Sequence, residues 1–240
     1  VQAGIEVPAD YVLERSEEVL KKLIDRGIGL ELNTSKIKLI RDGKLPDVEI
    51  LRRYYTGLVD RVKGKCDECV VRKLEIVMQQ AGVTPDICPA VRASLDKAQV
   101  TGAPAGAMVL PDGRVVTGKT SSLLGPSAAM LLNAVKLLAG IDKDLDLLPA
   151  SIIAPISDMK LRHLGHHNPR LHSDEVLIAL SISAVTNPLA ERVLKKLDDL
   201  RGSEAHFSVI LSEEDAKLYK RLGIHVSCEP RYEVKKLYHK

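Results

Sequence analysis

The chain has 240 residues, of which 45% are hydrophobic, so it can bury a core large enough for one large domain or two small ones. Its 35 basic and 32 acidic residues are well mixed and leave a net charge of +3, and only 3% of the residues are aromatic. Proteins that bind nucleic acids need a concentrated positive field or aromatic platforms for the bases. The composition therefore argues against nucleic acid as a partner.

The sequence also bears on the cellular compartment. No stretch approaches the roughly 20 unbroken apolar residues of a transmembrane helix, and the N-terminus lacks the pattern of a signal peptide. The cysteines are Cys66, Cys69, Cys88 and Cys228. Four unevenly spaced cysteines do not make a disulfide framework, so we expect reduced thiols and a cytoplasmic protein. Because the chain opens at Val1 without an initiator Met, we also expect a processed product or a fragment.

Residues 1–100 are predicted to be mainly helical. Apolar residues recur at helical spacing over 10–26 and over 50–62, and a third run over 67–81 is followed by Gly82, which suits a helix C-terminus. A short hairpin is expected at 30–40. The segment 85–103 is rich in proline and has weak periodicity, so we expect the domain boundary there.

Strands alternate with helices after Gly102. The β-prone runs 105–110 and 114–118 flank a Pro-Asp-Gly turn, which predicts a hairpin. The further predicted elements are a helix at 126–140, a strand at 147–154, a short helix at 155–163, a helix at 173–185, a helix from Asn187 to near Gly202, a strand at 206–211, a helix from Ser212 to Gly223 and a strand at 224–228. This alternation predicts an α/β class chain, with a three-layer α/β/α domain over 101–240.

A first candidate site follows the predicted hairpin, where Lys119, Thr120, Ser121 and Ser122 precede a helix that starts at Pro126. Hydroxyl groups, an ammonium group and the free N–H groups of a helix start can together hold a phosphate or a carboxylate. The glycine spacing of a Walker A loop is absent. The alternative is a plain polar connection between a strand and a helix.

A second candidate is the histidine-rich segment 163–172. Its histidines are His163, His166, His167 and His172. Gly165 and the Asn168-Pro169 step break the helix that would place two imidazoles together, and no cysteine lies nearby, so the spacing argues against a metal site without removing it. If they bind no metal, these histidines are structural or surface residues, or they serve in substrate binding or acid–base work. Arg170 adds a planar fork suited to phosphate or carboxylate.

A third candidate is the turn 202–206, in which Glu204 precedes His206 by two residues. A carboxylate in this place can orient the imidazole or act as a base beside it, and the alternative is a surface turn. The pair Cys66 and Cys69 is only half of a metal site, so we interpret it as incidental.

Four segments carry a family resemblance. They are TGKTSSLLGPSAAMLLNAVKLLAGI (117–141), HLGHHNPRLHSDEVLIALSISAVTNP (163–188), GSEAHFSVILSEED (202–215) and LGIHVSCEP (222–230). They resemble the C-terminal half of a bacterial family known as domain of unknown function 1846, closely over 100–240 and more loosely over 50–82. His163, Asn168, Arg170 and His172 match the family motif, whereas His166 and His167 do not.

The resemblance implies a domain similar in topology to the cytidine deaminases. Members of the family are about twice as long and carry a glycine-rich, P-loop-like segment that has no counterpart here, which implies a missing half or a partner chain. Deaminases need a His or Cys and a Glu at one helix start and Pro-Cys-x-x-Cys at the next. Gly-Pro-Ser-Ala (125–128) and Ala-Pro-Ile-Ser (154–157) stand in those places, so we exclude zinc deamination.

Three hypotheses about function follow. The first is an enzyme domain, a transferase or hydrolase, that binds a small phosphorylated or nucleotide-like metabolite through residues 119–122 and Arg170, while His172 or His206 moves a proton with Glu204 as orienting group. The ligand-binding set also includes His163 and Asn168. The second is a non-catalytic ligand-binding or assembly half that completes a site with a P-loop-like partner. The third is a structural oligomer.

These hypotheses can be told apart by geometry, because an enzyme needs its anion-binding groups and at least one imidazole to converge on one pocket. We expect a homo-oligomer and no membrane partner. The sequence names no cofactor.

Overall fold

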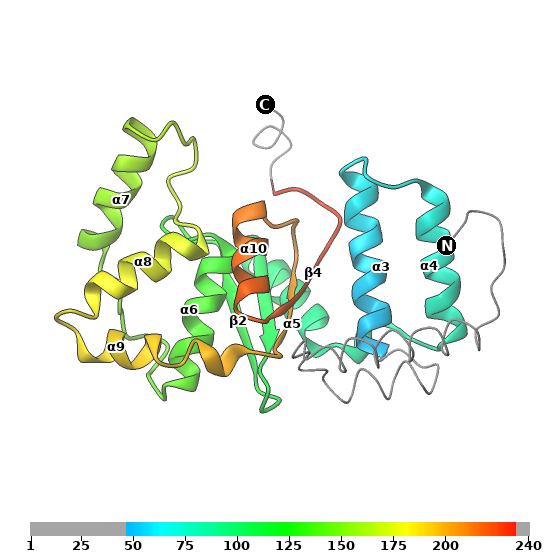
Figure 1. The fold of residues 1–240 in the computed structure, drawn as a ribbon, viewed down its shortest axis with the longest axis horizontal. Helices are drawn as coiled ribbons and strands as arrows, with labels where there is room; N and C mark the ends of the chain where they lie inside the picture. The colour runs from blue at the N-terminus through cyan, green and yellow to red at the C-terminus, as the bar shows by residue number, and fades with distance from the viewer. Residues whose placement is uncertain (1–46, 234–240) are drawn as a thin grey trace, which may run out of the picture. The chain divides into compact units, whose positions relative to one another are not determined.

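The structure is a computed structural model that describes residues 47–233 (Figure 1). The helix predicted over 10–26 and the hairpin predicted over 30–40 lie outside the described residues. The chain divides into two compact units, Val1–Glu49 and Ile50–Lys240, and almost all of the described residues belong to the second. Within the described part, no helix is both long enough and apolar enough to cross a membrane.

The described part begins with helices α3 (Asp47–Val62) and α4 (Glu68–Gln80), which confirm two of the predicted helices. A 3-10 turn (Pro85–Ile87) and helix α5 (Pro89–Thr101) follow, and the weak periodicity of 85–103 did not predict this helix. Helix α5 starts with proline at its first position and ends at Gly102 with φ of 63°, two signals that also suit a linker. The predicted boundary itself stays a prediction.

Four strands form one mixed sheet, which confirms the α/β class. They are β1 (Ala105–Val109), β2 (Val115–Lys119), β3 (Glu204–Phe207) and β4 (His225–Cys228), in the order β2-β1-β3-β4. Strand β1 is antiparallel to β2 and to β3, and β3 is parallel to β4. The hairpin β1–β2 has the predicted turn, in which Gly113 has φ of 85° and Asp112 accepts a hydrogen bond from the Arg114 N–H at 3.0 Å.

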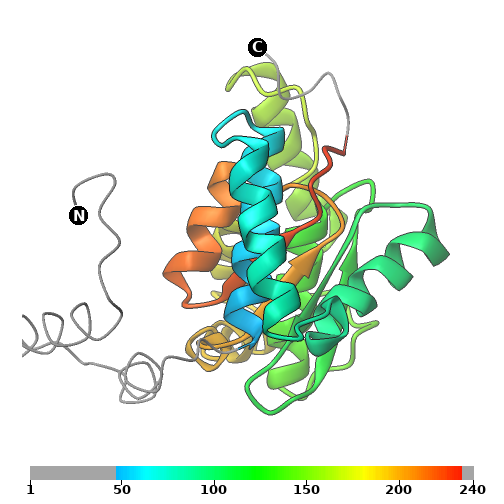
Figure 2. The same cartoon turned by 90° about the vertical axis from the view of Figure 1, so that its right-hand side faces the viewer.

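Helices cover both faces of this sheet (Figures 1 and 2). Successive side chains of β1 point to opposite faces: Met108 packs with α6 (Pro126–Leu138), and Ala107 packs with α5 and α3. Helix α6 approaches β2 closely, because a Cβ atom added at Gly118 would lie 2.2 Å from the Met130 nitrogen. Glycine is therefore required at this contact.

The strand predicted over 147–154 is wrong, because helix α7 (Ala150–Arg162) occupies most of this segment. Ile153 is buried, and Ile152 and Ile156 pack against the same core, a spacing of three and four residues that belongs to a helix. A short apolar run does not distinguish a strand from a buried helix. Pro155 suits the first turn of a helix, which predicted a helix start there, but it lies inside α7.

The remaining helices largely follow the predictions. They are α8 (Ser173–Ser183), α9 (Pro188–Leu194), a 3-10 turn (Asp198–Leu200) and α10 (Glu213–Arg221). The predicted helix from Asn187 is thus shorter than expected and does not reach Gly202. The cap of α10 is confirmed, since the Ser212 Oγ accepts a hydrogen bond from the Asp215 N–H at 3.1 Å.

Candidate functional site

The carboxyl ends of β2 and β3 lie at the same edge of the sheet, because β1 pairs Ala105 with Lys119 and Gly106 with Phe207. The chain runs from this edge into α6 and into α10, and the start of α8 joins them around a cavity of about 30 Å³. The polar side chains that line this small cavity include those of Ser127, Asn168, Arg170, His172, Asp215 and Glu233. Three helix starts and four charged or titratable side chains therefore meet at one place.

Two of the three candidate loops lie side by side at this edge. The Leu171 N–H donates to the Leu123 oxygen at 2.9 Å, and the Gly125 N–H donates to the Leu171 oxygen at 3.2 Å. These bonds flank a parallel bridge between Leu124 and Leu171. The loop after β2 and the histidine-rich loop are thus held together by their backbones.

His172 and Asp215 form a pair at the small cavity. The His172 Nδ1 lies 3.3 Å from the Asp215 Oδ2, and the two side chains are 24% and 7% exposed. Burial by itself would raise the pKa of Asp215, but hydrogen bonds from His172 and Ser173 outweigh it and hold that pKa at about 2. Since Asp215 is ionised, Nδ1 carries the proton that faces it, and the His172 Nε2 is the nitrogen left for a ligand.

Each side chain of the pair shifts the pKa of the other. The hydrogen bond to Asp215 raises the pKa of His172, although burial acts in the opposite direction. A raised pKa strengthens the imidazole as a base, which suits a group that takes up and returns a proton. Asp215 also accepts a hydrogen bond from the Ser173 N–H at 2.9 Å, so the same carboxylate caps the start of α8.

A buried lysine fixes the loop that carries this pair. Lys160 is 1% exposed, and its Nζ donates to the Glu175 Oε2 at 2.6 Å and to the Arg170 oxygen at 2.7 Å. Glu175 in turn accepts from the His172 N–H at 2.8 Å. The ion pair of Lys160 and Glu175 therefore holds the backbone of both Arg170 and His172.

The cationic group of the site is Arg170. Its Nη1 lies 2.6 Å from the Glu233 Oε1, and its N–H donates to the Asn168 Oδ1 at 3.1 Å. The hydroxyl of Ser127 lines the same cavity, is 1% exposed and has no hydrogen-bond partner within the described part of the chain. A buried hydroxyl without a partner is uncommon and marks a place where a polar ligand atom would be stabilised.

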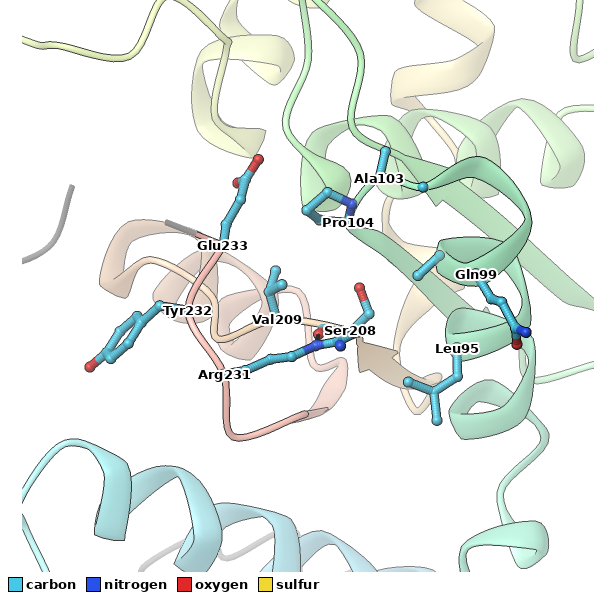
Figure 3. A pocket seen from close by; sticks show the side chains of 11 residues that line it. Leu95, Gln99, Ala103, Pro104, Ser208, Val209, Arg231, Tyr232 and Glu233 are labelled. Atoms are coloured by element: carbon cyan, nitrogen blue, oxygen red, sulfur yellow. Dashed lines mark hydrogen bonds between the residues drawn. The ribbon is translucent and has the colours of Figure 1, made fainter. Parts of the chain in front are cut away.

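A second, larger cavity of about 610 Å³ borders the first (Figure 3). Helix α5 lines one side with Leu95, Ala98 and Gln99, and the segment after β4 lines the other side with Arg231, Tyr232 and Glu233. Two residues, Val209 and Glu233, line both cavities. Small-molecule sites usually have volumes of about 300–1,000 Å³, so the larger cavity has the size of a metabolite site.

The other predicted ligand residues lie outside the two cavities. Lys119, Ser121, Ser122 and His163 are exposed. The Ser121 Oγ accepts hydrogen bonds from two N–H groups of its own loop. This agrees with the alternative of a plain polar connection between a strand and a helix. Thr120 is buried and its hydroxyl has no partner among residues 47–233.

The third candidate loop lies at the opposite edge of the sheet. Glu204 pairs with Val109 at the far end of β1, and its Oε1 accepts from the Arg52 Nη2 at 2.9 Å. His206 is fully buried on the α3 face, where its Nδ1 lies 2.8 Å from the Ser227 Oγ and its Nε2 lies 3.3 Å from the Glu229 Oε1. The structure thus pairs His206 with Glu229, not with Glu204, and places neither beside His172.

The histidine-rich loop is exposed over His163, His166 and His167. Among residues 47–233, no three side chains of His, Cys, Asp or Glu come together as a metal site would need. The exposure of these three imidazoles fits the alternative of surface histidines.

Asp215 and Ser127 line the small cavity but are not among the predicted site residues, although the helix start that carries Ser127 belongs to the first candidate site. Asp215 is the third residue of α10, where an acidic residue is typical of a helix start. The sequence therefore indicates a structural role and not a place in a site. Ser127 follows a proline at the start of α6, which also looks like a helix cap alone. Their position beside His172 depends on contacts over 43 residues or more of sequence and could not be inferred locally.

Comparison with known proteins confirms the resemblance. The sequence model described as "Domain of unknown function DUF1846, C-terminal" matches residues 86–238. A UPF0371 protein of Streptococcus pyogenes serotype M5 is 49% identical over 192 residues, and one of Streptococcus thermophilus is 48% identical over the same length. Each alignment covers 80% of this chain and 39% of the relative, so the chain spans about two fifths of the length of these relatives. This chain belongs to the DUF1846 family, of which it contains the C-terminal domain.

Proposed function

We propose that this chain is the ligand-binding and proton-transferring domain of an enzyme that acts on a small metabolite with a phosphate or carboxylate group. The observation that carries the proposal is the His172–Asp215 pair at a cavity that Arg170 also lines. An ionised carboxylate that orients an imidazole, with a guanidinium nearby, is the equipment of general acid–base chemistry on an anionic substrate.

In this proposal His172 is the catalytic base or acid. Asp215 holds the proton on Nδ1, so Nε2 accepts a proton from an attacking water or alcohol and later returns it to the leaving group. Transfer of a phosphoryl group to water or to an alcohol uses such a step, which makes a hydrolase or a transferase the expected class. Asp215 positions the ring and does not itself exchange protons with the substrate.

Arg170 and the start of α6 would hold the anionic group. Helix α6 has no acidic residue in its first turn, whereas α8 and α10 each have two or more. Its N-terminal partial charge is therefore not balanced within its own first turn, and the Ser127 hydroxyl stands at this start without a partner in residues 47–233. The larger cavity beside it offers room for the rest of the metabolite.

We further propose that residues 101–240 have a topology similar to the cytidine deaminases without their zinc ligands. The hairpin followed by α6, and the parallel pair β3 and β4 joined by α10, support this proposal. The helix starts read Gly-Pro-Ser-Ala (125–128) and Ser-Glu-Glu-Asp (212–215), with no cysteine or histidine, and residues 154–157 lie inside α7. The scaffold would thus use His172 and Asp215 where deaminases place zinc chemistry.

The test is a ligand screen on the full chain with matched variants. Thermal shifts are measured with inorganic phosphate and with a panel of phosphomonoesters and carboxylates, because a ligand that binds only the folded state raises the melting temperature. We expect Arg170→Lys to weaken binding about tenfold with little change in stability, and His172→Asn to remove turnover with binding kept. If no compound shifts the melting temperature at millimolar concentration, the proposal fails for this chain.

A second candidate function is a non-catalytic half that completes a site with a P-loop-like partner. The observation that favours it is the length of the relatives, since 61% of each lies outside the alignment. A full-length relative that turns over a substrate equally well with and without the imidazole of His172 would favour this candidate.

A homo-oligomer and a cytoplasmic location remain part of the proposal. All four cysteines are free, which agrees with that compartment.

A further inference from the structure

The side chain of Glu233 stands between the two cavities. It lines the small cavity with His172 and the large cavity with Tyr232, and Val209 is the other residue that lines both. The small cavity of about 30 Å³ has room for roughly one water molecule and not for a phosphate. A ligand that extends from the large cavity to His172 therefore needs this partition to move.

We propose that the Glu233 carboxylate occupies the place of the substrate's anionic group, and that binding exchanges one for the other and joins the two cavities. The inference rests on the proposed function and deepens it by naming the substrate class. The Arg170 Nη1 now lies 2.6 Å from the Glu233 Oε1. A carboxylate or phosphate oxygen of a ligand would make the same charge-assisted bond, so the exchange costs little beyond the movement of one side chain.

The backbone shortly before Glu233 is held by hydrogen bonds, so the proposed exchange requires no movement of the segment 229–231. The Glu229 N–H donates to the Phe207 oxygen at 2.8 Å, and the Arg231 oxygen accepts from the Ile210 N–H at 2.8 Å. The Arg231 Nε donates to the Ser208 oxygen at 2.6 Å. Figure 3 shows the Arg231 side chain reaching toward Ser208, while the Glu233 side chain points away from both. The segment 229–231 is thus fixed beside the end of β3, and Glu233 follows it two residues later.

The lining of the large cavity indicates the body of the substrate. Leu95, Ala98, Pro104 and Val209 supply apolar walls. Gln99, Ser208, Arg231 and Tyr232 supply polar groups to the same cavity. A body with both an apolar and a polar part fits these walls. The expected class is therefore a small organic molecule with a carboxylate or monophosphate group and a partly apolar body.

The test compares Glu233→Gln with wild type in the full chain by titration calorimetry. The probes are inorganic phosphate, phenyl phosphate and, as the neutral counterpart, phenol. Glu68→Gln is the matched control, because it removes one carboxylate from an exposed pair with Arg61 on other helices. We expect Glu233→Gln to bind phenyl phosphate at least tenfold more tightly than wild type, with a similar gain for inorganic phosphate, while Glu68→Gln and phenol show no gain.

The outcomes separate this inference from the proposed function. If wild type binds phenyl phosphate, Arg170→Ala loses that binding and Glu233→Gln brings no gain, then the exchange is refuted and the proposed function stands. If neither wild type nor Glu233→Gln binds any anionic probe, both are refuted. Glu233→Ala serves as a second variant, and a gain equal to that of Glu233→Gln supports displacement of the carboxylate over any new contact made by the amide.

Discussion

Replacing Asp215 with asparagine removes the charge on which the site is built, and the structure allows the cost to be worked out. The pKa of Asp215 is about 2 in the folded protein, against an ordinary value of 3.8. One pKa unit corresponds to about 1.4 kcal/mol, so the charge stabilises the fold by about 2 kcal/mol at pH 7. We expect Asp215→Asn to lower the free energy of unfolding by about that amount.

The sign of the pH dependence follows from the lowered pKa. The stabilisation is fully present above pH 3.8 and is lost as the pH falls through 2, with about half remaining at pH 3. Urea denaturation of Asp215→Asn and wild type at pH 7 and pH 3 measures the difference. An equal stability at pH 7, or a loss that is the same at both pH values, would refute the reasoning.

The same variant tests the coupling to His172. The hydrogen bond to Asp215 raises the pKa of His172 while burial lowers it, so removing the charge should leave burial dominant and bring the imidazole pKa down. Protonated His172 stabilises the fold below pH 6.5, and this contribution is lost as the pH rises through the folded pKa. An NMR titration of the imidazole resonances measures the shift, and an unchanged pKa would mean that the two side chains do not interact.

Further substitutions test the frame around the site. Gly118→Ala should destabilise the protein by about 2 kcal/mol or more, because its Cβ would meet the α6 backbone; thermal denaturation with an unchanged midpoint would contradict this contact. Lys160→Met should lower the free energy of unfolding by about 3 kcal/mol, because Glu175 loses its charged partner. Lys195→Met in an exposed pair should lower it by less than about 0.5 kcal/mol, and equal losses in urea denaturation would contradict the role of burial. Pro155→Ala should stabilise α7 by about 1–2 kcal/mol, since proline lacks the N–H that a helix interior uses; a lower melting temperature would refute this.

The elements that could be predicted from the sequence are those with a signal inside a few residues. Asp112 and Gly113 specify the hairpin turn, Pro126 starts α6 and Ser212 caps α10. Each of these three local signals is confirmed at its predicted position. The site could be predicted in part for the same reason. Arg170 and His172 are predicted together because they share one loop.

The features that could not be predicted depend on contacts between distant residues. The side-chain alternation of β3 puts His206 on the α3 face, and only the order of strands and helices decides which face that is. Proximity in sequence suggests Glu204 as the partner of His206, yet Glu204 pairs with Arg52 on another element, at 152 residues' separation. The apolar run of α7 is ambiguous until its neighbours in the core are known.

The charges at this edge of the sheet support the proposal that a ligand anion binds here in place of Glu233. The starts of α8 and α10 share the buried carboxylate of Asp215, and each also carries acidic residues in its first turn. The start of α6 has none, and Arg170 adds a full positive charge beside it. Glu233 offsets that charge from a position at the rim of the large cavity, where water still reaches 19% of its side chain. A partly exposed pair contributes little to stability, so we expect a ligand that contacts Arg170, the α6 start and the large cavity together to displace Glu233.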